Sequence, residues 1–158
     1  MSRWPFLITF REKVYGNGFL AEVVAQGRAL GVVEGKNDFW LYGVNPGALA
    51  AGGASGGDAH INFVRALRTV LYDFSGEAAT FENFKAETER FFREANTETE
   101  KEWLEAVAEV KAGKSAPTDV PRKPFDTPLS VTVALKDNTN TFSAADNIVD
   151  EPSRALAA

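Results

Sequence analysis

The sequence contains no cysteine, and it has a single histidine, His60. The lack of cysteine excludes a disulfide framework, a thiolate nucleophile and a cysteine-ligated metal site. With one histidine, neither a histidine-based metal cluster nor a relay of two histidines can be built from this chain. Because the remaining reactive side chains do not group into a catalytic set, we expect a non-enzymatic protein without a metal ion or cofactor.

Long apolar runs are also missing. No stretch approaches the roughly 20 apolar residues of a membrane-spanning helix, and residues 1–5 do not resemble a signal peptide. We therefore expect no membrane association and a cytoplasmic location. The formal net charge is −5 at pH 7, whereas non-specific nucleic-acid binding requires a basic surface. The charge argues against nucleic-acid binding by this chain alone and is compatible with a basic protein partner.

The chain is rich in apolar and aromatic side chains. Hydrophobic residues make up 44% of the 158 residues and include 12 Phe and 3 Trp, enough for one domain with a sizeable core. Residues 6–15 alternate between apolar and polar, which predicts a half-buried strand, and a glycine turn at 16–18 predicts a hairpin. Residues 19–26 are the predicted return strand, 27–34 a further short strand and 38–44 the next one.

The middle of the chain changes from strand to helix. An apolar stripe predicts a first amphipathic helix over residues 57–74 that covers one face of the meander. A second helix is predicted from a cap at Thr80 to about residue 95. A third is predicted to start at Thr97, with Glu100 as its capping partner, and to end at Gly113. The last two helices form a helical insertion at about 80–112.

A proline-rich linker over residues 113–127 separates the helices from a last strand. Residues 128–135 alternate again, and because a lone strand is unstable we expect them to return to the meander. The expected domain therefore spans residues 1–135. Residues 136–158 are polar and lack periodicity, which predicts a flexible tail.

The helical region carries the acidic charge. Residues 75–111 contain ten Glu and no Asp against five Lys and Arg, which gives 5 − 10 = −5. One interpretation is a solvated helical surface with pairs such as Glu89–Arg93. The other is an electrostatic face that steers a basic partner toward the protein.

Two aromatic residues fall on the side of the strand at 38–44 that faces away from Phe39 and Leu41. These residues, Trp40 and Tyr42, would form a partner surface or a base-stacking platform if that face of the sheet is open. Alternatively, the second and third helices fold across the face and bury both side chains.

A glycine-rich corner joins the strands to the first helix. Proline and glycine end the strand near Val44, since proline lacks a ladder donor, and a serine and an aspartate three residues apart form a capping box. The order of strand, hairpin, strand, corner and amphipathic helix resembles the HicB-like antitoxin family. In that family the corner has a characteristic sequence pattern: Pro-Gly, a few residues, Gly, one residue, Thr, two residues and then Glu-Ala. With one extra residue after the first glycine, the corresponding positions are Pro46, Gly47, Gly53, Ser55, Asp58 and Ala59.

The resemblance implies an α+β fold: an antiparallel β meander with helices on one face, of the partial RNase-H-like β-β-β-α-β type, here with two extra helices. It also implies a non-catalytic domain that binds and neutralises a small, basic HicA-type mRNA-cleaving toxin, usually as a homo-oligomer. The sequence departs from the family by an inserted hairpin at 27–40, by the extra helices and by the absence of a recognisable DNA-binding segment after the last strand.

One alternative comes from a different class of function. An RNase-H-like nuclease or nucleic-acid-binding domain would use the open sheet face. Carboxylates on its strands, here Glu12, Glu22 and Asp38, would then have to meet at one metal site.

Overall fold

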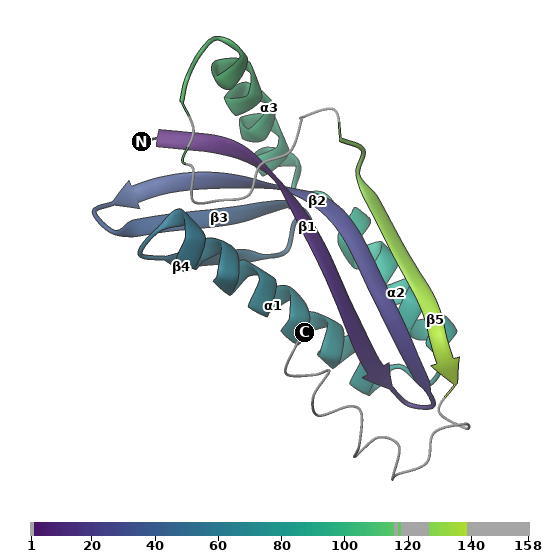
Figure 1. The fold of residues 1–158 in the computed structure, drawn as a ribbon. Coiled ribbons are helices and arrows are strands. Elements are labelled where there is room, and N and C mark those ends of the chain that lie inside the picture. The colour runs from purple at the N-terminus through teal and green to yellow at the C-terminus, as the bar shows by residue number, and fades with distance from the viewer. Residues whose placement is uncertain (1, 116, 118–126, 139–158) are drawn as a thin grey trace.

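The computed structural model describes residues 2–115, 117 and 127–138. Four strands come first, then three helices, and a fifth strand closes the described chain (Figure 1). The elements are β1 (Ser2–Gly16), β2 (Phe19–Gly35), β3 (Asp38–Asn45), β4 (Ala50–Gly53), α1 (Gly56–Glu77), α2 (Phe81–Arg93), α3 (Thr97–Lys111) and β5 (Ser130–Asn138).

All strand pairings are antiparallel, so the α+β class with an antiparallel sheet is confirmed. The long strand β2 is the centre of the sheet. One edge of β2 pairs with the whole length of β1. The other edge of β2 pairs with β5 over residues 19–26 and with β3 over residues 28–35. The separate short strand predicted over 27–34 is therefore wrong, because these residues continue the same strand. Figure 1 shows the resulting sheet as long and strongly curled.

The last strand pairs with β2, as its apolar alternation led us to expect. Its bounds differ from the prediction, because the pairing continues through Asn138 and the first residues assigned to the tail, 136–138, belong to the sheet. Residues 139–158 of the predicted tail, and most of the predicted linker, lie outside the described residues.

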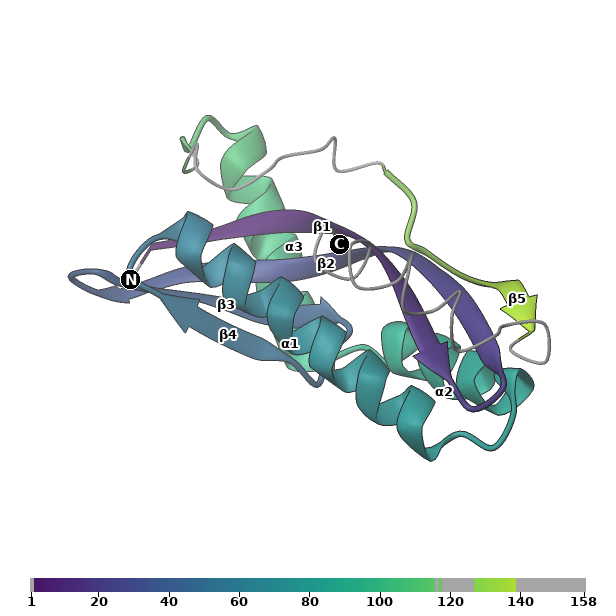
Figure 2. The same ribbon diagram turned by 60° about the horizontal axis from the view of Figure 1, so that its bottom comes forward.

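The main core lies between one face of the sheet and the helices α1 and α2 (Figure 2). Alternate residues of β1 and β2 point into it, as period two requires. The side chains of α1 that meet them recur at helical spacing. The large side chains buried there include Phe6, Phe10, Phe19, Phe63, Leu67, Leu71, Phe84 and Phe92.

The third helix packs on the opposite face, which corrects the prediction of helices on one face only. Trp103 and Val107 of α3 form a small core with Leu7 and Val44. The indole Nε1 of Trp103 also donates a hydrogen bond of 3.2 Å to the carbonyl oxygen of Phe6. The reason is that β1, β2 and β3 carry apolar residues on both faces in this half of the sheet, so both faces need cover.

Side-chain caps fix where the helices begin. The hydroxyl of Thr80 accepts a hydrogen bond from the backbone N–H of Asn83, so the predicted cap of α2 is confirmed. The cap of α3 is Asn96, whose side-chain oxygen accepts from the N–H of Thr99. The predicted pairing of Thr97 with Glu100 is therefore wrong by one residue, because an asparagine side chain caps a helix at least as well as a threonine.

Replacing Phe63 by alanine tests the main core. The ring of Phe63 is 0% exposed, and emptying such a site costs about 3–5 kcal/mol in the free energy of unfolding. Ile61→Ala on the same helix is the matched control, since Ile61 is 50% exposed; we expect it to cost less than about 0.5 kcal/mol. Urea unfolding of both variants measures the difference, and equal costs would contradict this assignment of the core.

Candidate functional site

The six residues of the glycine-rich corner serve the fold. Gly47 approaches the loop between α2 and α3 so closely that a Cβ atom would lie 2.3 Å from the backbone nitrogen of Asn96. The hydroxyl of Ser55 accepts from the N–H of Asp58 at 3.1 Å, which confirms that Ser55 caps α1. Ala59 is buried under the sheet, while Pro46 follows β3 and Gly53 ends β4. The corner thus joins β3, β4 and α1, and it packs against the loop between α2 and α3.

The guanidinium of Arg28 holds β3 and α3 in place on β2. Arg28 of β2 donates two hydrogen bonds to the side-chain oxygen of Asn45, at 3.0 and 2.6 Å, and pairs with the carboxylate of Glu100 on α3. Its Cζ atom also lies 5.2 Å from the ring centroid of Trp103. The strands β2 and β3 and the helix α3 are therefore all joined through Arg28. This residue was not among those predicted from the sequence.

Trp40 and Tyr42 lie on the face of β3 that looks away from the main core, as their spacing predicted. Their rings are stacked, with centroids 6.0 Å apart and planes at 18°. Trp40 packs on Gly52 of β4, where an added Cβ atom would come within 2.6 Å of the indole. Tyr42 contacts the cluster of Leu30, Val32 and Ala106, the last from α3. Both aromatic side chains are half-buried, so α3 covers this face only in part.

Each aromatic side chain donates a hydrogen bond to a carboxylate. Trp40 Nε1 donates to Asp38 Oδ1 at 2.9 Å, and the hydroxyl of Tyr42 donates to Glu34 Oε1 at 2.5 Å. The hydrogen bond to Glu34, followed by burial and the negative charges of Glu34 and Asp38, raises the pKa of Tyr42 to about 12. We call Trp40, Tyr42, Glu34 and Asp38 the aromatic platform. Both carboxylates are exposed, and no cation in the described part of the chain forms an ion pair with either.

The strand carboxylates that a nuclease would need are far from forming one site. Glu12 is 3% exposed in the main core and pairs with Arg68 of α1. Glu22 faces the other side of the sheet, 3.3 Å from Arg11. Asp38 belongs to the platform at the β2–β3 turn. Among the described residues, no group of three or more His, Cys, Asp or Glu side chains is placed to hold a metal ion.

The single histidine has no part in the platform. His60 lies half-buried near the start of α1, and burial lowers the pKa of its imidazole.

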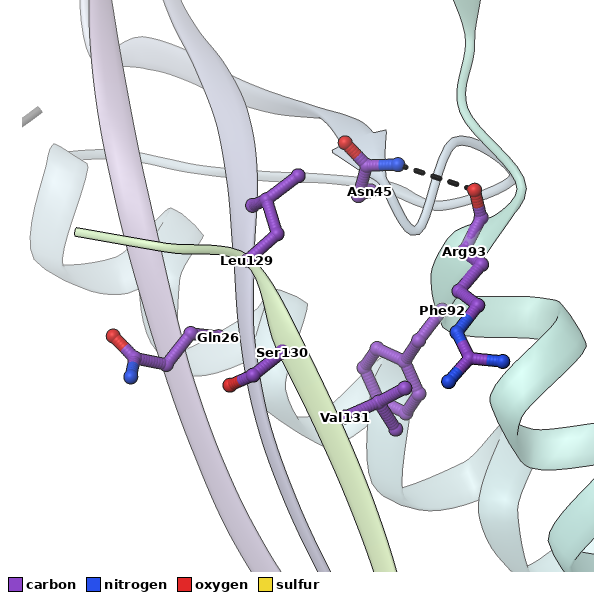
Figure 3. Close-up of a pocket in the computed structure, with 7 residues that line it drawn as sticks. All are labelled: Gln26, Asn45, Phe92, Arg93, Leu129, Ser130 and Val131. Carbon is purple, nitrogen blue, oxygen red and sulfur yellow. Dashed lines mark hydrogen bonds between the residues drawn. The ribbon is translucent and has the colours of Figure 1, made fainter. Parts of the chain in front are cut away.

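A cavity of about 300 Å³ opens where the edge of β2 changes its partner from β5 to β3 (Figure 3). In Figure 3 the side chains of Phe92 and Val131 lie together on one wall, and the amide of Gln26 points away across β1. Asn45 closes another side through a 3.4 Å hydrogen bond from its amide nitrogen to the carbonyl oxygen of Arg93. This cavity could not be predicted from the sequence, since its walls come from β2, β3, α2 and the start of β5 with the residue before it. The full lining is Gln26, Asn45, Phe92, Arg93, Leu129, Ser130 and Val131.

Replacing Glu34 by glutamine tests the geometry of the platform. Without the carboxylate, the hydrogen bond no longer favours the neutral phenol, so the pKa of Tyr42 should fall from about 12 toward the ordinary 10.0. In the native protein the bond stabilises the fold fully below pH 10, and its contribution is lost as the pH rises from 10 to about 12. Titration of tyrosinate absorbance, with Tyr42→Phe to assign the signal, measures the shift. An unchanged titration curve in Glu34→Gln would contradict the hydrogen bond.

Comparison with models of known protein families gave no match, and comparisons with curated proteins and with solved structures gave none either. Within the described residues, none of the helices combines the length and the apolar character needed to span a membrane. The functional conclusion therefore depends on the residues and contacts of the chain itself.

Proposed function

We propose that this chain is a non-enzymatic protein-binding module of the HicB-like antitoxin kind. In this proposal it binds and neutralises a small, basic HicA-type mRNA-cleaving toxin in the cytoplasm, and it acts as a homo-oligomer. The aromatic platform is the observation that carries the proposal. Half-buried tryptophan and tyrosine side chains are the residues most enriched at the centres of protein–protein interfaces.

The charges around the platform support a basic partner. Glu34 and Asp38 lie beside the aromatic rings and form no ion pair in the described part of the chain. Carboxylates at the rim of an apolar contact speed the association of a positively charged protein and select against an acidic one. The overall charge of −5 acts in the same direction.

The helix α2 attracts a basic partner less than the acidic composition of residues 75–111 suggests. On α2, Lys85 pairs with Glu89, and Arg90 pairs with both Glu87 and Glu94. These exposed pairs within one helix neutralise most of its surface. The interpretation of a solvated surface therefore fits α2, and the unpaired carboxylates of the platform are the stronger attraction for a cation.

A second candidate function is nucleic-acid binding on the outer face of β1, β2 and β5. The observation that favours it is a group of cations there: Arg11, Lys13 and Lys136 surround Glu22, which leaves a local charge of +3 − 1 = +2. Such a surface can contact phosphates. The aromatic side chains that would stack bases lie elsewhere, on β3, so we place this function second.

Removing the two aromatic side chains of the platform should weaken partner binding. The partner to test is the product of a small basic reading frame adjacent to the gene, co-expressed with the protein. We expect the double variant Trp40→Ala/Tyr42→Ala to weaken the complex at least about 30-fold, because the loss of even one interface aromatic of this kind costs about 2 kcal/mol or more. Titration calorimetry measures the affinity, and thermal unfolding shows whether the variant is folded.

The control is Leu104→Ala, which removes a side chain that is 54% exposed on α3, outside the platform. It should leave the affinity unchanged. Glu34→Gln/Asp38→Asn provides a second variant that keeps both rings and should lower the association rate. A complex that tolerates both platform variants, or the absence of any small basic product that binds, would contradict the proposal.

A further inference from the structure

We infer that the aromatic platform is a recognition site for an arginine side chain supplied by a protein partner. This inference rests on the proposed function, because a protein partner has to supply the arginine. The guanidinium would stack on the aromatic rings and donate hydrogen bonds to Glu34 and Asp38.

The two carboxylates of the platform have unused hydrogen-bonding capacity. Asp38 accepts from Trp40 through Oδ1, and Glu34 accepts from Tyr42 through Oε1. Each carboxylate has two oxygen atoms and about four acceptor positions, so each retains most of its capacity. Because the aromatic N–H and O–H groups orient both carboxylates, their positions are set before any ligand arrives.

Each of the other two tryptophans has a cation over its ring. The guanidinium of Arg28 lies over Trp103 at 5.2 Å and pairs with Glu100. The ammonium of Lys114 lies over Trp4, also at 5.2 Å. Trp40 is the only tryptophan over which the described residues place no cation, although two carboxylates stand beside it.

Charge and shape distinguish arginine from other ligands of the platform. An anionic ligand would meet two carboxylates, which excludes it by repulsion. The rings of Trp40 and Tyr42 differ by only 18° in orientation, and a planar guanidinium can stack on such a surface while its five donors reach carboxylates at the rim. A lysine ammonium has three donors and no plane to stack, so it should bind more weakly.

The indole N–H signals in a proton–nitrogen NMR spectrum test the inference directly. The chain has 3 Trp, and Trp40→Phe identifies the signal of Trp40. The probes are short Gly-Ser peptides that carry two arginines, two lysines or two citrullines. We expect the arginine peptide to shift the Trp40 signal to saturation, the lysine peptide to bind several-fold more weakly, and the neutral citrulline peptide to give no shift.

Two charge-matched double variants show whether the platform carboxylates are responsible. Glu34→Gln/Asp38→Asn should weaken binding of the arginine peptide at least tenfold. Glu77→Gln/Glu102→Gln changes the net charge equally at two exposed helical positions that form no ion pair in the described chain, and it should bind the peptide as the native protein does. If both double variants weaken binding of the arginine peptide equally, the binding reflects only the net charge of the protein, and the inference is overturned.

The outcomes also separate this inference from the proposed function. If the arginine peptide shifts Trp40 as expected and no adjacent basic product binds, the arginine site stands and the toxin partner fails. If the partner binds through the platform but the arginine peptide leaves the Trp40 signal unchanged, the arginine site is overturned while the protein-binding function stands. The same conclusion follows if the lysine peptide binds as tightly as the arginine peptide.

Discussion

The arrangement of this fold depends on one partly buried cation. The side chain of Arg28 is 14% exposed, at the point where the edge of β2 passes from β5 to β3. A guanidinium in such a position is costly unless its donors are satisfied. Asn45, Glu100 and the ring of Trp103 satisfy it, and these three residues belong to β3 and α3. The same contacts that compensate the charge therefore fix β3 and α3 on the sheet.

Two features follow from this junction. The first is the cavity beside Asn45, since β5 and β3 share one edge of β2 and do not meet along it. The second is the partial cover of the outer face. With α3 held over Leu7, Leu30 and Val32, its contact reaches Tyr42 through Ala106 and leaves the aromatic pair half-exposed. A surface that is neither buried nor fully solvated is suited to binding.

The sequence predicted the local elements well where periodicity was strong. The alternation of Phe6, Ile8 and Phe10 defined the inner face of β1, and the stripe through Phe63, Leu67 and Leu71 defined α1. It failed at positions where partners far apart in the chain decide. Gly27 suggested a break between two strands, yet β2 continues through it because β1 pairs with both halves. Likewise, nothing local in α3 shows on which face of the sheet it packs.

By itself the sequence determined that Trp40 and Tyr42 share a face and that the corner from Pro46 to Ala59 starts a helix, because both depend on short-range spacing. Tertiary structure alone decided that Glu34 stands beside those rings, that Glu12 is buried against Arg68 and that Arg28 ties three elements together. The physical reason is strand pairing. Register brings Glu34 and Tyr42 to the same hairpin face, and the contacts of α3 with the sheet reach that face only as far as Tyr42.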